Sequence, residues 1–88
     1  MLANKDIPTY IYDGSLVMEN MMLTAHSLGL GSCWIHRAKE TFETEEGKQI
    51  LKDLGINGNY EGIANCIIGY SDTETVIHSR KEKYIYKI

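Results

Sequence analysis

The sequence lacks the features that mark several classes of protein. It has one proline, two cysteines and no apolar run near the roughly 20 residues that a membrane-spanning helix requires. Two cysteines, Cys33 and Cys66, are too few for a disulfide framework, so we expect buried, small apolar residues at both positions. Lysines and glutamates are interspersed without a basic face, and the net charge is −3, which argues against a nucleic-acid partner. The N-terminus carries no signal pattern, so we expect a cytoplasmic chain without a membrane partner.

The length of the chain sets a limit on its core. Eighty-eight residues make one domain at most. Such a chain buries about 60–65% of its unfolded surface, which leaves a lone core marginal. Yet 43% of the residues are hydrophobic, in more clusters than one small core needs. We therefore expect oligomerisation or a further segment that packs on this one.

Helical periodicity is strongest in residues 16–28. Pro8 excludes a helix across it, and residues 10–12 predict a short strand or an extended entry. Asp13 or Ser15 is expected to cap the helix that follows. Leu16 and Leu23 lie almost opposite the main apolar arc of this helix, which predicts burial on two sides. We expect His26 to be a hydrogen-bonded packing residue. The main arc holds residues 17, 18, 21, 22, 25 and 28.

The rest of the chain predicts a mixed α+β fold. Gly29 and Gly55 are expected to end two helices, and Thr44 to cap the second, whose apolar stripe is formed by Ile50, Leu51 and Leu54. Residues 32–35 are expected to be extended, and residues 57–59 to turn. Residues 63–70 read as a central strand covered on both faces, and residues 81–88 as an edge strand.

The motifs argue against three kinds of site. Gly29 and Gly31 do not form a dinucleotide-binding fingerprint, because they follow a helix and Trp34 replaces the third glycine. Cys33, His36, Cys66 and His78 fit no zinc-binding spacing, so we expect no metal. No ordered hydrolase motif is present.

A cationic pair lies near the C-terminus. His78 and Arg80 are two residues apart, so in an extended segment their side chains point the same way. The guanidinium fork of arginine matches phosphate oxygens. The pair is either a phosphate clamp or part of a solvated charged run before the last strand.

In their order along the chain, several motifs resemble the C-terminal half of the nitroreductase family. They are the helix that starts near Asp13-Gly14-Ser15, the segment Ala25-His-Ser-Leu-Gly-Leu-Gly-Ser-Cys-Trp-Ile35, the Glu/Lys-rich helix, Ile67-Ile-Gly-Tyr70, the basic pair and a terminal strand. The resemblance covers about residues 10–88. It implies an antiparallel sheet packed with helices, and an intertwined homodimer with FMN at its interface.

The same resemblance implies a function and a set of site residues. Cys33, Trp34, Ile35 and His36 would border the isoalloxazine ring, largely through backbone groups, and Arg80 would meet the FMN phosphate with His78 beside it. The implied activity is that of an FMN-dependent NAD(P)H oxidoreductase acting on a small electron acceptor. Because the flavin supplies the redox chemistry, we assign no catalytic acid or base.

The N-terminal half of the relatives has no counterpart here. Its phosphate motif, similar to Arg-Ser-x-Arg, and its Asn near the flavin find no match in this sequence. We therefore expect residues 1–88 to be a single domain that corresponds to the C-terminal half, from a fragment or a truncated member. The alternative is a non-catalytic dimerisation or regulatory module derived from the same family.

Overall fold

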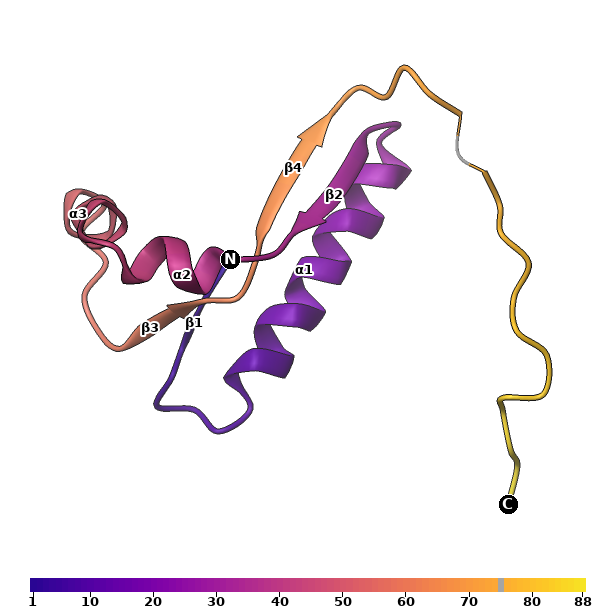
Figure 1. Cartoon of the computed structure of the whole chain (residues 1–88), viewed down its shortest axis with the longest axis horizontal. Coiled ribbons are helices and arrows are strands. Elements are labelled where there is room, and N and C mark those ends of the chain that lie inside the picture. The colour runs from indigo at the N-terminus through magenta and orange to yellow at the C-terminus, as the bar shows by residue number, and fades with distance from the viewer. Residues whose placement is uncertain (75) are drawn as a thin grey trace.

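Helices and antiparallel strands are interspersed along the chain. The structure, a computed structural model, describes residues 1–74 and 76–88. The elements are β1 (Leu2–Asn4), α1 (Tyr10–Ser27), β2 (Gly31–Ile35), α2 (Ala38–Glu43), α3 (Glu45–Asp53), β3 (Tyr60–Gly62) and β4 (Asn65–Gly69) (Figure 1). This confirms the predicted α+β class.

Helix α1 begins earlier than predicted. Residues 10–12, expected as a strand, form its first turn, and Thr9 rather than Asp13 or Ser15 is the residue before it. The Ser15 hydroxyl lies inside the helix and donates to the Ile11 carbonyl at 2.7 Å. Pro8 is compatible with this start because it precedes the helix and its missing N–H is not needed there.

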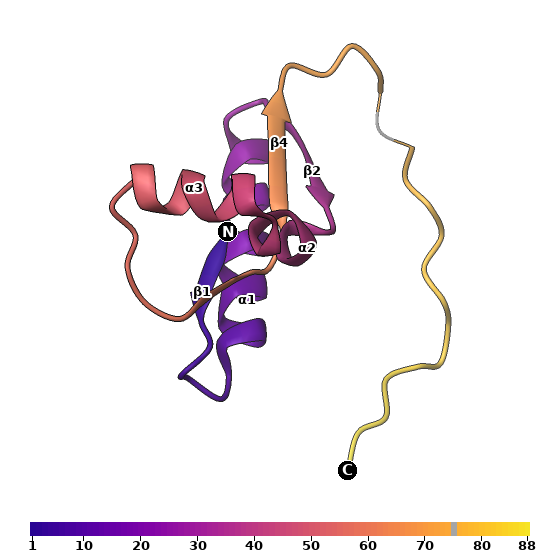
Figure 2. The ribbon, with the colours of Figure 1, turned by 60° about the vertical axis from the view of Figure 1, so that its left-hand side comes forward.

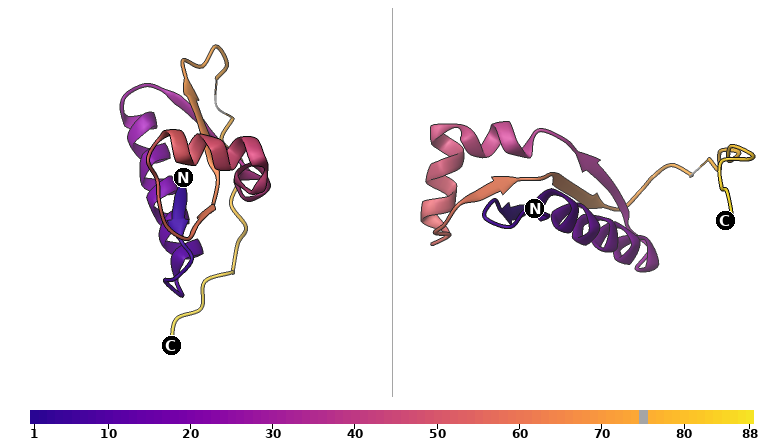
Figure 3. Two further views of the ribbon diagram at one scale, coloured as in Figure 1. Left: turned by 90° about the vertical axis from the view of Figure 1, so that its left-hand side faces the viewer. Right: turned by 90° about the horizontal axis from the view of Figure 1, so that it is seen from below.

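The strands form two antiparallel pairs. β1 pairs with β3, and β2 pairs with β4 in the register that sets Cys33 opposite Ile67. α1 lies along one face of the β2–β4 pair (Figure 3). The prediction of a central strand covered on both faces is wrong for this chain: among the described residues β4 pairs with β2 alone, and Ile67 and Ile68 are 59% and 50% exposed.

The predicted helix ends are confirmed. Gly29 has φ +76°, and the Leu30 N–H donates back to the Ala25 carbonyl at 2.9 Å. Gly55 repeats this arrangement with φ +69° and a 2.9 Å bond from Ile56 to Leu51. A left-handed glycine of this kind ends many helices. At the start of α3 the Thr44 hydroxyl accepts from the Gly47 N–H at 3.0 Å.

The buried core is small. Gly14 lets α1 approach Ile63 closely, since a Cβ at residue 14 would lie 2.7 Å from Ile63 Cγ1. Leu16 and Leu23, expected to be buried on the second side of α1, are each 60% exposed. Several other residues expected to be buried are also exposed: Val17, Met21, His26, Leu28, Cys33, Ile50 and Leu54. The buried hydrophobic residues are Met18, Ala25, Ala38, Ile63 and Ala64.

The C-terminal tail, residues 70–74 and 76–88, runs apart from the helices and strands (Figure 2). The predicted edge strand at residues 81–88 is wrong, because no strand of the described chain lies beside the tail to pair with it. The radius of gyration is 16.5 Å, against about 12 Å for a compact domain of this length.

Among the residues placed by the structure, no helix is long and apolar enough to cross a membrane.

Candidate cofactor site

Strand β2 divides the predicted site residues between its two faces. Cys33 and Ile35 are exposed on the face that looks away from α1, where Cys33 is paired with Ile67. Trp34, the only tryptophan, is half-buried on the opposite face, beside Ser15 and Met22 of α1. Alternation along a strand produces this division. The side chains of residues 33–35 therefore do not share one cavity, while their backbone forms one continuous edge.

The turn after β2 carries His36 and Arg37. Both side chains are exposed, and Arg37 adopts a left-handed backbone with φ +73°. For a residue with a Cβ this conformation costs about 1–2 kcal/mol. The Arg37 Nη1 lies 3.7 Å from Glu40 Oε1, an exposed contact too weak to impose the conformation. The surrounding structure must therefore hold the turn in place.

A pocket opens beside this turn. Its volume is about 440 Å³, and Trp34 and His36 line it together with Arg37, Lys39, Tyr10 and Glu61. Cys33 lies instead at a separate hollow of about 340 Å³ with Ile67, Ile68 and Tyr70. Ile35 lines neither. The structure thus brings together Trp34 and His36 of the four residues expected around the ring.

A buried carboxylate at this pocket was missed by the sequence reasoning. Glu61 is 8% exposed in the middle of β3. Its Oε2 lies 3.0 Å from Lys5 Nζ and 3.1 Å from Lys39 Nζ, and its Oε1 accepts from the Tyr10 hydroxyl at 3.0 Å. Tyr10 is 51 residues away in sequence. The one local signal was an acidic residue directly before an apolar strand.

The cluster around Glu61 shifts three pKa values. Hydrogen bonds from Lys5 and Lys39 lower the pKa of Glu61 from 4.5 to about 2. The hydrogen bond with Glu61 raises the pKa of Lys39 and also that of Tyr10. The lysine cations favour the ionised carboxylate, and the Glu61 anion in turn favours the charged form of Lys39 and the neutral form of Tyr10. The Glu61 carboxylate therefore stays ionised at neutral pH between its two lysine partners.

His78 and Arg80 lie in the C-terminal tail and are exposed. The tail runs apart from β2 and α2 (Figure 1), and residues of these two elements line the pocket of Trp34 and His36, so the chain by itself does not join the two parts of the predicted site. Within residues 1–74 and 76–88, no three His, Cys, Asp or Glu side chains gather closely enough to hold a metal ion. Cys33 and Cys66 are both free thiols.

Comparison with known proteins places this geometry in a family. One similar structure is a nitroreductase with bound FMN from Bacteroides fragilis NCTC 9343, with a TM-score of 0.83 and 26% identity over 99% of this chain and 48% of that one. Another is an FMN-dependent nitroreductase from Clostridium difficile R20291, with a TM-score of 0.67 and 32% identity over 89% of this chain and 47% of that one. No functionally curated protein matches the sequence.

The chain thus spans about half the length of these solved structures. The first match covers 99% of the chain, so its alignment extends into the C-terminal tail. The profile of the nitroreductase family matches residues 5–74, most of the sequence. This chain belongs to the nitroreductase family.

Proposed function

We propose that the chain supplies the C-terminal half of an FMN-dependent NAD(P)H oxidoreductase. The observation that carries the proposal is the family match over the segment that builds β2 and the turn of residues 36–37. Both structural neighbours are described as FMN-bound or FMN-dependent. We extend FMN to this chain, with NAD(P)H as electron donor, a small molecule as acceptor, and the cytoplasm as location.

The residues around the turn suit one part of FMN. The pocket offers an aromatic wall at Trp34 and a cationic group at Arg37, which suit a flat ring system that accepts negative charge, while Lys39 is paired there with Glu61. When bound, FMN supplies the redox chemistry, and the protein positions it. Strand β2, paired with β4, holds the backbone edge of residues 33–36 against which the ring would lie.

The phosphate would be held by the tail. Arg80 offers a planar fork of donors, and His78, two residues before it, adds a further donor. Since the tail runs away from β2 and α2 of its own chain, we propose that it reaches the site of a second copy. Each site would then combine the turn of one chain with the tail of its partner.

The exposed surface supports a homodimer. The accessible surface is 7720 Å², whereas about 5,200 Å² is expected for a compact monomer of 10.0 kDa. The excess is larger than the roughly 800 Å² that each partner buries in a standard interface. Leu16 and Leu23 are exposed on one side of α1, and Val17 and Leu28 on the other. Partners on both sides of α1 would bury these side chains.

A titration of the chain with FMN tests the cofactor, read as quenching of flavin fluorescence. Arg80→Ala is expected to raise the Kd by about tenfold to a hundredfold, the effect of losing hydrogen bonds between charged groups. Lys87→Ala, the same loss of charge elsewhere in the tail, is the control and should change the Kd less than twofold. Absence of quenching at tens of micromolar FMN would rule out a chain that binds the cofactor without further segments.

A non-catalytic dimerisation module is the second candidate. It is favoured by the separation of His78 and Arg80 from the pocket and by the exposed apolar sides of α1. It predicts a stable oligomer without flavin absorbance and without NAD(P)H oxidation. Light scattering combined with an absorption spectrum of the purified protein separates the two functions.

A further inference from the structure

The turn of residues 36–37 needs support from outside itself. Arg37 is left-handed, and no side chain accepts from the first N–H groups of α2. The Arg37 carbonyl accepts from the Thr41 N–H at 3.1 Å and from the Thr41 hydroxyl at 2.9 Å, but both donors belong to the same short helix. α2 has six residues, too few to stabilise its own first turn. The position of the turn is therefore decided by whatever holds the first residues of α2.

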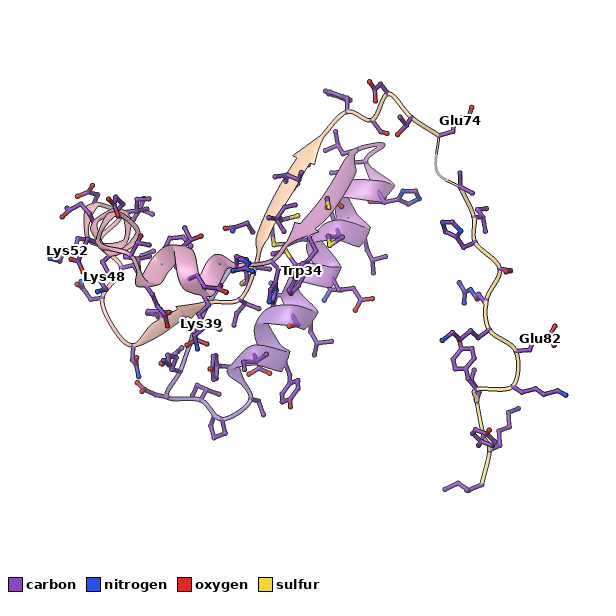
Figure 4. The ribbon with its side chains drawn as sticks, viewed as in Figure 1. Trp34, Lys39, Lys48, Lys52, Glu74 and Glu82 are labelled. Carbon is purple, nitrogen blue, oxygen red and sulfur yellow. The ribbon has the colours of Figure 1, made fainter. Side chains whose placement is uncertain are left out.

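Strand β3 holds those residues in two ways. A Cβ at Gly62 would collide with the Ala38 carbonyl, so the two backbones are in direct contact. One residue earlier, Glu61 reaches Lys39 at 3.1 Å (Figure 4 shows Lys39 at the start of α2 and Trp34 on β2). Ala38 is fully buried by this packing.

Glu61 is also fixed from its other sides. Lys5 follows β1 and contacts the same oxygen as Lys39, at 3.0 Å, while Tyr10 of α1 donates to the second oxygen. A buried carboxylate needs such partners, and with three of them it is held in one position. Of these contacts, the one with Lys39 alone leads to α2 and the turn.

We propose that Glu61 is a positioning residue that holds the turn of residues 36–37 in place through Lys39. The proposal rests on the proposed function for the ligand of that turn. Glu61 lines the same pocket, but its carboxylate oxygens are engaged by Lys5, Lys39 and Tyr10. Its role is to keep the strained turn ordered before the cofactor arrives, so that binding does not have to order it.

Two lysine variants separate positioning from general stability. Lys39→Met and Lys5→Met each remove one ammonium group from the same carboxylate oxygen, at nearly equal distances. Amide hydrogen exchange of residues 36–39 is measured in the full chain without cofactor. We expect Lys39→Met to speed this exchange about tenfold, and Lys5→Met to change it less than twofold.

The role of Glu61 is tested by rescue and by a double variant. Lys39→Arg keeps a cationic donor and should restore slow exchange. In a Glu61→Gln background, Lys39→Met should add little, since both changes break one connection. Equal effects of the two lysine variants, or additive effects in the double variant, would overturn the proposal, and so would unchanged exchange in Lys39→Met.

FMN titration of the same variants adds a second readout. Lys39→Met should raise the Kd about tenfold, because the turn must then be ordered when FMN binds. Lys5→Met should leave the Kd within twofold. If neither the parent chain nor any variant binds FMN, the proposed function fails. The exchange measurement still decides the role of Glu61.

Discussion

At the scale of single residues, the most unusual backbone in the folded part is that of Arg37. Gly29 has nearly the same φ, +76° against +73°, and carries no Cβ. One position thus has the residue that suits its conformation, and the other does not. Strain at a residue without a structural need for it is typical of functional sites.

Substitutions at Arg37 and Gly29 should have opposite effects on stability. Arg37→Gly relieves the left-handed strain and is expected to change the free energy of unfolding by between zero and about +1 kcal/mol. Gly29→Ala should lower it by about 1 kcal/mol, and a Cβ there meets no atom within 4 Å, so the cost is conformational. Urea denaturation measures both. A large loss of stability in Arg37→Gly would contradict the account of strain.

Glu61 makes stability depend on pH. Its folded pKa of about 2 lies below the value of 4.5 for the free group, so its contribution is fully present above about pH 5. The contribution is lost as pH falls from there toward 2. Glu61→Gln should therefore be less stable than the parent chain at pH 7 and similar to it near pH 2. Denaturation curves at pH 7, 5 and 3 test this, and a constant difference would contradict it.

At the scale of elements, close packing of α2 on β3 makes Gly62 a sensitive position. A Cβ there would collide with the carbonyl of Ala38. Gly62→Ala should lower the free energy of unfolding by about 1–3 kcal/mol, as overpacking does. Gly69→Ala in β4 is the matched control, since its Cβ would meet no atom within 4 Å. Thermal denaturation compares the two, and an equal effect would show that packing at Gly62 is not tight.

Elements defined by neighbouring residues could be predicted, and elements defined by distant ones could not. The helix ends at Gly29 and Gly55 and the Thr44 cap depend on bonds over a few residues. The first turn of α1 does not, because the Tyr10 hydroxyl bonds to Glu61 across 51 residues. Strand propensity in residues 10–12 was overridden by this tertiary context.

At the scale of the whole molecule, the excess surface makes the oligomeric state the decisive property. Leu23→Glu places a charge on an apolar side of α1 that is exposed in the single chain. We expect the parent chain to be oligomeric and this variant to shift toward monomer, since burying an unpaired charge is costly. Asn57→Glu, in an exposed turn, is the control. Light scattering gives the masses, and a monomeric parent chain would contradict the proposed homodimer.

The candidate site divides in the same way between local and distant contacts. Trp34 and His36 could be chosen because a helix, a glycine stop and a strand follow each other directly, and the pocket beside the turn contains both. Glu61, Lys5 and Tyr10 could not, since no spacing in the sequence brings them together. Whether His78 and Arg80 complete the site depends on where the tail lies, and a tail without a partner strand has no local rule to place it.

Local sequence thus accounts for the helix boundaries, the extended segment after Gly31 and the family resemblance, because short-range hydrogen bonds and backbone preferences act within a few residues. Tertiary contacts account for the start of α1, the small core and the cluster around Glu61. The physical reason is that burial and charge pairing depend on residues brought together from distant parts of the chain. The same reason applies to contacts between chains. The sequence identifies the sides of α1 as apolar, but only packing determines what buries these exposed side chains.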